Sequence, residues 1–245
     1  MLYWRMILYK MKNYFESHPY AKIGLLVIPL VLLTVLMNNY FPEFKSEDYP
    51  NFIVAFEFAK TLKNINLLFS QLTPTEIEKI DTGNYIDFAF MVAYCLFLIL
   101  FFRKTYNIHG HRFLIAGIPL SILILAADFY ENILLLEITD TYSKSGIVAG
   151  LQLILDQLQI VTWIKWRGMA VAFFLLFFTL IKGKILSKIV AVFCLLPIIE
   201  VILLCTTSLF SVSDFTLSVF AVFTVIFVYS FAFKKKIKKP QNSNC

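Results

Sequence analysis

The chain has 245 residues, of which 59% are hydrophobic and 16% are charged, and its mean hydropathy is +0.76. A typical soluble domain is about 45–50% apolar and about 25% charged, so these values exclude a water-soluble fold. The formal net charge of +6 lies in short clusters between apolar runs, as in the loops of a membrane protein. This distribution argues against a nucleic-acid-binding protein. The four cysteines show no CxxC spacing, which predicts neither a disulfide framework nor a zinc site.

The N-terminal segment 1–22 combines aromatic and basic side chains, including Trp4 and Arg5. This mixture favours an interfacial helix on the inner membrane surface. The first long apolar run begins at Ile23, which is late for a cleaved signal peptide, and no small-residue cleavage site follows it. Residues 23–40 are therefore predicted to form the first membrane span.

Five further apolar runs follow, each close to the roughly 20 residues that cross a hydrocarbon core of about 30 Å. They cover residues 85–102, 113–137, 161–181, 189–210 and 215–233. The sequence thus predicts an all-α polytopic transmembrane helix bundle with six spans. Residues 23–181 are expected to form a four-span core and residues 182–233 two further spans, with a lysine-rich tail over residues 234–245.

Lysine and arginine predict the orientation, because short cytoplasmic loops carry an excess of both. The basic segments are 1–22, 103–112, 182–188 and 234–245. The segments between them are acidic or nearly neutral, so six spans place all four basic segments on one side. This pattern predicts a multi-pass protein of the cytoplasmic membrane with both termini in the cytoplasm. The bilayer is the expected partner, and the lysine-rich tail is suited to anionic lipid head groups.

The outer segment 41–84, between the first two predicted spans, has a regular pattern. Apolar residues recur at helical spacing over residues 51–70, which predicts an amphipathic helix on the outer membrane surface or over the bundle. The sequence Thr-Pro-Thr-Glu that begins at Thr73 is a capping box with proline at the first helical position. It predicts a short helix over residues 74–80 that Gly83 stops. Together these elements predict a compact outer helical cap.

Ionisable residues at membrane depth are informative, because insertion scales assign roughly 2.5–3.5 kcal/mol to a charge at a span centre. In the third span, Asp128, Glu131 and Asn132 stand at i, i+3 and i+4 and share one helix face. Buried carboxylates need a cation or a proton. The candidate cations are Lys165 and Arg167, early in the fourth span. Similar depths below the outer ends of the two spans predict a pair between Glu131 and Lys165.

A second group lies in the second span, where Asp87 and Tyr94 are seven residues apart and share a face. The sequence therefore predicts a ligand-binding site in the outer half of the bundle. Its residues are Asp87, Tyr94, Asp128, Glu131, Asn132 and Lys165. The alternative is an interhelical polar clamp, although such hydrogen bonds average only about 0.6 kcal/mol in membranes. His109 and His111 lie in a basic loop, which predicts a polar turn and no metal site, and the absence of nucleotide-binding motifs predicts no cofactor.

Three stretches, taken in order, carry a resemblance to a known family. They are residues 56–59 (FEFA), residues 87–90 (DFAF) with Tyr94, and residues 127–132 (ADFYEN) with a later Lys165. They resemble a family of small uncharacterised bacterial multi-pass membrane proteins that pairs an LDFxFxxxY span with a DxxEN span. The resemblance covers about residues 50–180, and Ile86 stands where that family has leucine. It implies a four-span core in a bacterial inner membrane and no established activity.

Three classes of function remain open. The polar site binds or transports a small polar solute, an ion or a lipid head group, which requires a cavity at the carboxylates. Alternatively, the protein is a membrane enzyme that acts on a lipid, with Asp128 or Glu131 as general base, which requires a lateral opening. The third class is a structural or partner-binding subunit, which an exposed apolar face on the outer cap would favour. The sequence assigns no catalytic residue and no protein partner.

Overall fold

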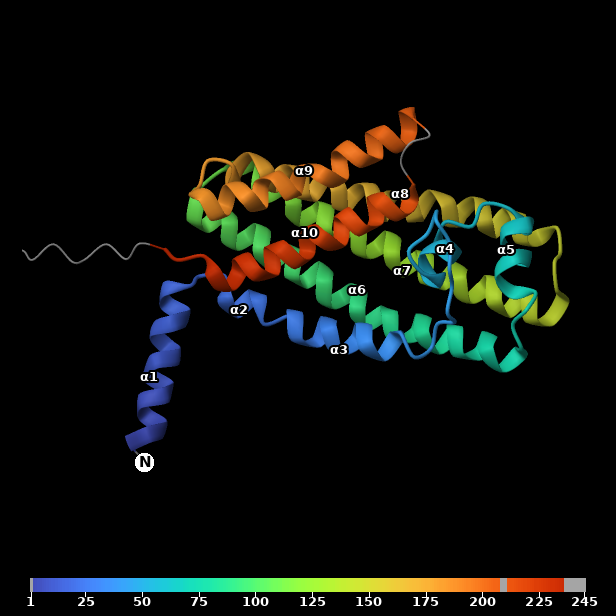
Figure 1. Cartoon of the computed structure of the whole chain (residues 1–245), viewed down its shortest axis with the longest axis horizontal. Helices are drawn as coiled ribbons and strands as arrows, with labels where there is room; N and C mark the ends of the chain where they lie inside the picture. The colour runs from blue at the N-terminus through green and yellow to red at the C-terminus, as the bar shows by residue number, and fades with distance from the viewer. Residues whose placement is uncertain (1, 208–210, 236–245) are drawn as a thin grey trace, which may run out of the picture.

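The computed structural model describes residues 2–207 and 211–235, and all regular structure in this part of the chain is helical (Figure 1). The elements in chain order are α1 Leu2–Ser17, α2 Ala21–Gly24, α3 Val27–Met37, α4 Phe52–Glu57, α5 Leu62–Phe69, α6 Pro74–His109, η1 Arg112–Ala116, α7 Gly117–Ser145, α8 Gly150–Leu180, α9 Ile185–Thr206 and α10 Val212–Ala232. Within the described residues, five helices are long and apolar enough to cross a membrane, and a bent pair at the N-terminus raises the number to six. The protein is an all-α polytopic helix bundle.

The bent pair consists of Met6–Ser17 and Ala21–Met37, whose axes differ by 104°. The second member packs along α6 as part of the bundle, whereas α1 leaves the bundle at a steep angle (Figure 1). At 1.5 Å per residue, Ala21–Met37 covers about 26 Å, close to the thickness of a hydrocarbon core. Its helix is interrupted before Val27, because Pro29 lacks a main-chain N–H and its ring clashes with the carbonyl four residues earlier.

The last turn of α1 meets the end of α10 at one end of the bundle. The Tyr14 hydroxyl donates a hydrogen bond of 3.0 Å to the carbonyl of Phe231, and the Lys235 main-chain N–H donates one of 3.0 Å to the carbonyl of Ser17. An even number of membrane crossings brings the two ends of a chain to the same side. The tail beyond Lys235, with its remaining lysines, lies outside the described residues.

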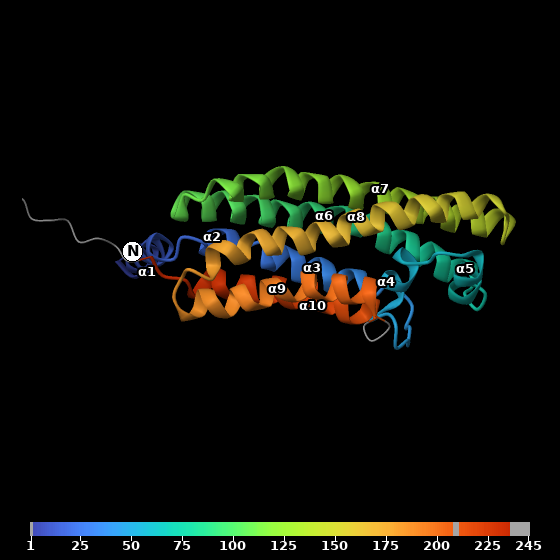
Figure 2. The same cartoon turned by 90° about the horizontal axis from the view of Figure 1, so that it is seen from above.

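Three long helices form the centre of the bundle. α6, α7 and α8 have 36, 29 and 31 residues, whereas α9 and α10 have 22 and 21. α7 packs between α6 and α8, and α9 packs between α8 and α10 (Figure 2). The expected spans therefore lie inside longer helices. At 1.5 Å per residue, α6–α8 exceed a core of about 30 Å, and their outer ends extend past α9 and α10 beside α5 (Figures 1 and 2).

The outer cap differs from the single amphipathic helix expected over residues 51–70. It contains two short helices, α4 and α5, because Thr61 starts a new helix through a capping box with Asn64. Both helices turn their apolar faces inward. Ile65 and Phe69 of α5 are buried with Leu155 of α8 in one apolar cluster. The cap is thus packed on the outer ends of α7 and α8, and the prediction of one long helix was wrong.

The short helix expected over residues 74–80 also needs correction. Thr73 caps the helix as predicted, with Pro74 at the first position, but the helix continues without interruption to His109. Gly83 does not stop it, because a glycine stop requires a left-handed backbone and Gly83 keeps helical geometry. It is buried, and an added Cβ would lie 2.7 Å from the Phe41 ring. Gly83 therefore provides close packing.

Close packing between α6 and α7 makes Gly117 a sensitive position. A Cβ built there would lie 2.3 Å from the ring of Phe102, which is fully buried. We expect Gly117→Ala to lower the free energy of unfolding by about 1–3 kcal/mol, the usual effect of overpacking. Gly150→Ala is the matched control, because no atom lies within 4 Å of its added Cβ. Thermal unfolding in mild detergent should show a loss only for Gly117→Ala, and equal melting temperatures would contradict the packing described here.

Candidate functional site

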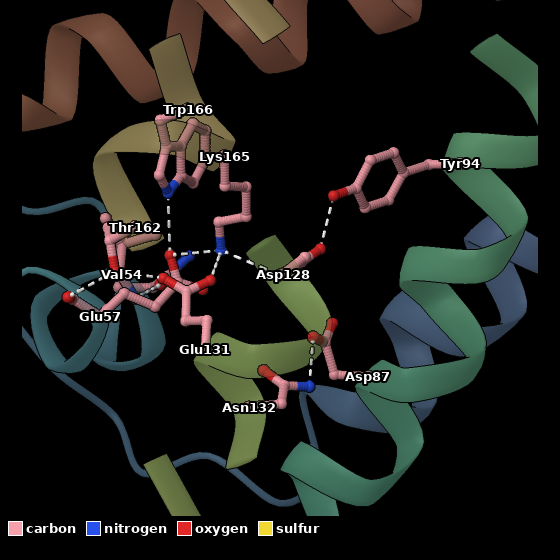
Figure 3. Close-up of polar contacts among 11 residues, drawn as sticks. Val54, Glu57, Asp87, Tyr94, Asp128, Glu131, Asn132, Thr162, Lys165 and Trp166 are labelled. Carbon is pink, nitrogen blue, oxygen red and sulfur yellow. Dashed lines mark hydrogen bonds and ion pairs between the residues drawn. The ribbon is translucent and has the colours of Figure 1, made fainter. Parts of the chain in front are cut away.

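Lys165, at the middle of α8, is the centre of a buried polar cluster (Figure 3). Its side chain is 4% exposed, and its ammonium forms ion pairs with three carboxylates. The Nζ atom lies 3.0 Å from Oε2 of Glu57 and 3.2 Å from Oδ1 of Asp128, and it also contacts Glu131. The Glu131–Lys165 pair expected from the sequence is present. One ammonium therefore holds acidic side chains from the cap and from α7 against α8.

Two of these carboxylates also accept a hydrogen bond from an aromatic side chain. The indole N–H of Trp166 donates to Oε2 of Glu57 at 3.0 Å, and the hydroxyl of Tyr94 donates to Oδ2 of Asp128 at 2.5 Å. All four side chains are buried. Because a buried acceptor without a donor is costly, these two donors help to keep the carboxylates in place.

Glu131, the third carboxylate, and Asp87, a fourth carboxylate nearby, have neutral donors as well. The Thr162 hydroxyl donates to Glu131, and the Asn132 amide donates to Oδ2 of Asp87 at 2.8 Å. Asn132 lies one helical turn beyond Asp128 on the same face of α7. Among the described residues, Asp87 forms no ion pair. We call Glu57, Asp87, Asp128, Glu131 and Lys165 the acid–lysine cluster.

The acid–lysine cluster holds four carboxylates against one ammonium. A buried charge without a counter-charge is strongly unfavourable, and neighbouring carboxylates disfavour each other's ionised form. Burial raises the pKa of Glu57 in the cap, the Lys165 ammonium opposes this shift, and Asp128 adds to it. The cluster therefore has capacity for a bound proton or an additional cation.

The aromatic and basic residues next to Lys165 have different surroundings. Trp166 is 3% exposed, and its ring centroid lies 6.2 Å from that of Phe215. Arg167, the other candidate cation, is exposed, and its guanidinium lies 4.3 Å from the Trp163 ring centroid. Two residues along an α-helix are about 200° apart, so Lys165 and Arg167 face opposite sides.

All six residues predicted for the site lie in this polar region, as one group around Lys165 and a neighbouring pair, Asp87 and Asn132. Asp128, Glu131 and Lys165 meet directly, Tyr94 joins through Asp128, and Asp87 pairs with Asn132. The sequence analysis missed Glu57, Thr162 and Trp166. Glu57 was assigned to an outer surface helix, although its place in the apolar run FIVAFEFA was a signal of burial. The neutral donors carried no comparable signal.

A cavity of about 800 Å³ opens beside the acid–lysine cluster, between α3, α6, α8, α10 and the segment that precedes α4. Its polar lining includes Glu57, Asp87, Tyr94, Asp128 and Lys165. The other walls are largely apolar, with side chains such as Leu30, Met169 and Phe223. The lining follows α3 from Val27 to Asn38, which is roughly 16 Å at 1.5 Å per residue. The cavity is therefore elongated. The acid–lysine cluster borders it from α4, α6, α7 and α8, and Glu43 and Lys45 border it from the segment before α4.

The cavity has an outlet between α3 and α10. Val31 of α3 and Val228 of α10 both line it, and they are 54% and 60% exposed. α3 packs on α6, whereas α10 packs mainly on α9, so a slot remains between the first and last helices of the bundle. In a bilayer this slot faces lipid. Glu131 and Asn132 do not line the cavity, which leaves Asp87 and Asp128 as the carboxylates of α6 and α7 that border it.

Metal binding was not expected from the sequence. In the part of the chain that the structure describes, no group of three or more His, Cys, Asp or Glu side chains is arranged to hold a metal ion. Gly110 ends α6 in a left-handed conformation between His109 and His111, which matches the expected turn. Binding of anionic lipid by the lysine tail stays a prediction.

The three stretches that carry the family resemblance meet at the acid–lysine cluster, through Glu57, Asp87 and Asp128. The family assignment itself stays a prediction. In comparisons with known proteins, the chain matches no protein-family model, no curated protein and no solved structure.

Proposed function

We propose that this multi-pass membrane protein binds an amphipathic, lipid-like ligand. The polar group of the ligand meets the acid–lysine cluster, and its apolar chain lies between α3 and α10. One observation carries this proposal: the cavity of about 800 Å³ joins buried charged side chains to an apolar wall that opens on the lipid-facing surface. Ligand sites are typically concave, mostly apolar and of about 300–1,000 Å³, with a few placed polar groups.

The shape and lining of the cavity favour an amphiphile over a small polar solute or an ion. An apolar slot beside lipid attracts hydrocarbon chains, because a hydrated solute would have to lose its water there. The acid–lysine cluster gathers the buried charged groups in one part of the lining, which suits a ligand with one polar end. This proposal selects the lipid option from the three ligand classes that the sequence left open.

Two further observations support binding over the other two classes of function. Among the described residues that line the cavity there is no serine, cysteine or histidine to act as nucleophile. The outer cap offers little apolar surface to a protein partner. Within α4 and α5, both fully described, Leu67 is the one large apolar side chain that is exposed.

The basic segments support a cytoplasmic location for both ends of the chain, in the cytoplasmic membrane. The meeting of α1 with the end of α10 agrees with an even number of spans. In that orientation the acid–lysine cluster lies in the outer half of the bundle, since Trp166 beside it packs against Phe215 in the first turn of α10. The cavity outlet then faces the outer leaflet and the middle of the bilayer.

Trp166 provides a direct test, because it lines the cavity. In a Trp4→Phe/Trp163→Phe background, Trp166 is the remaining tryptophan, and a bromine-labelled alkyl chain that enters the cavity should quench its fluorescence. Three single-chain probes of equal length, ending in a primary amine, a hydroxyl or a phosphate, would be titrated into protein in neutral detergent. We expect saturable quenching by at least one probe.

A cavity-filling variant separates specific binding from partition into the micelle. Val31→Phe/Thr224→Phe places two rings in the cavity at exposed positions of α3 and α10, which the fold should tolerate. We expect roughly tenfold weaker quenching affinity, or about 1.4 kcal/mol. Val192→Phe on the exposed face of α9, outside the cavity, is the matched control and should bind as wild type does. Linear quenching by every probe, unchanged in the filled variant, would contradict the proposal.

A further inference from the structure

The charges beside the cavity are unbalanced, which bears on the polar group of the ligand. This argument rests on the proposed function. Lys165 is the one basic side chain of the acid–lysine cluster, and its ammonium is already surrounded by Glu57, Asp128 and Glu131. It is therefore not free to bind a phosphate or carboxylate. An anionic group at the acid–lysine cluster would face carboxylates, since the other lysine of the cavity lining, Lys45, lies in the segment before α4.

Within the acid–lysine cluster, Asp87 is the carboxylate with the fewest favourable contacts. It lines the cavity from α6, is partly exposed, and has one neutral donor, the Asn132 amide at 2.8 Å. Among the described residues, no lysine, arginine or histidine forms an ion pair with it. A half-buried carboxylate on a largely apolar wall is expected to attract a cation.

Asp128 supplies a second carboxylate at the cavity. Its side chain is 3% exposed and lines the cavity. Its Oδ2 accepts the Tyr94 hydrogen bond, whereas its Oδ1 accepts no hydrogen bond in the described structure and has the Lys165 ammonium at 3.2 Å. Asp128 therefore adds a second negative charge beside Asp87, while its own two oxygens already face the Tyr94 hydroxyl and the Lys165 ammonium. Asp87 and Asp128 thus place two carboxylates in the cavity lining, and Figure 3 shows both side chains.

We infer that the ligand carries an ammonium group, which binds in the cavity beside the carboxylates of Asp87 and Asp128. The ligand is then a cationic or amine-bearing amphiphile, with its chain in the slot between α3 and α10. Such an ammonium supplies the positive charge that the cluster lacks, and it donates a hydrogen bond to Asp87, which has one neutral donor and no ion pair among the described residues. A neutral polyol would satisfy the acceptors but leave the charge unbalanced.

The Trp166 quenching titration tests this inference with the same three probes. We expect the primary amine to bind at least tenfold more tightly than the alcohol of equal chain length, and the phosphate to bind most weakly, with tenfold equal to about 1.4 kcal/mol. Asp87→Asn keeps the acceptor for Asn132 and removes the charge. It should abolish the preference for the amine over the alcohol. Asp140→Asn, at an exposed position of α7, is the control and should keep the preference.

The outcomes separate this inference from the proposed function. Equal binding of amine and alcohol by the wild type, or an unchanged preference in Asp87→Asn, would overturn the ammonium assignment while amphiphile binding stands. Failure of all three probes would overturn both. Titration with bromine-labelled phosphatidylethanolamine and phosphatidylglycerol then distinguishes a membrane lipid from a single-chain amine as the ligand. Preference for the amine-bearing phospholipid points to a membrane lipid, and equal affinity for the two alongside amine selectivity points to a single-chain amine.

Discussion

Replacement of Lys165 with methionine is expected to lower the free energy of unfolding by about 3–5 kcal/mol, the usual effect of removing one partner from a buried ion pair. The change leaves Glu57, Asp128 and Glu131 without their shared cation in a site that is almost closed to water. Methionine has a similar length and no charge, so the loss reports mainly the missing ammonium. Thermal or chemical unfolding of purified protein in mild detergent measures the effect.

Arg167→Met provides the control for Lys165→Met. Arg167 lies two residues further along α8, is exposed, and stacks on Trp163, so its removal should cost no more than about 0.5–1 kcal/mol. Addition of Glu131→Gln to Lys165→Met should recover part of the stability, because it removes one of the uncompensated charges. Equal effects of Lys165→Met and Arg167→Met would show that the acid–lysine cluster does not stabilise the fold.

Tyr94→Phe is expected to lower the free energy of unfolding by about 1.5–3 kcal/mol, the range for a hydrogen bond to a charged group. The phenylalanine ring keeps the packing of Tyr94 and removes the donor from Oδ2 of Asp128. Asp128 is already one of several carboxylates that share a single ammonium, so the loss of a neutral donor increases the cost of its charge. The same unfolding assay measures the change.

Tyr85→Phe on α6 is the matched control for Tyr94→Phe. Tyr85 is 64% exposed, and surface substitutions usually change stability by less than about 0.5 kcal/mol. A loss confined to Tyr94→Phe supports the buried hydrogen bond as its cause. A loss of the same size in both variants would instead indicate a general effect of tyrosine removal from this helix.

The two stability predictions also bear on the proposed function. A ligand that supplies a cation to the cluster should stabilise the wild type according to its affinity and concentration. It should stabilise Asp87→Asn much less, because the carboxylate without an ion pair has been removed. Structural and ligand-binding roles of the acid–lysine cluster are therefore separable: Lys165 holds the carboxylates together, and Asp87 is available to a ligand.

The sequence alone determined the class of the fold and the centre of the candidate site. Apolar runs of membrane-spanning length predict helices with little ambiguity, because backbone polar groups in lipid must be satisfied within the helix. Helical periodicity put Asp128, Glu131 and Asn132 on one face, and residue counts from the span ends matched the depths of Glu131 and Lys165. Both deductions need only the geometry of a single helix.

Tertiary structure alone decided the position of the outer cap and the rest of the site. Glu57 reaches Lys165 because α4 folds back onto α7 and α8, and local periodicity carries no information about such a contact. The same holds for Gly83, which packs under Phe41 and does not end α6, and for Trp166, which faces inward. Spacing along a helix fixes depth and relative direction. Which face meets a neighbour depends on contacts between residues far apart in the chain, and these form only when the whole bundle packs.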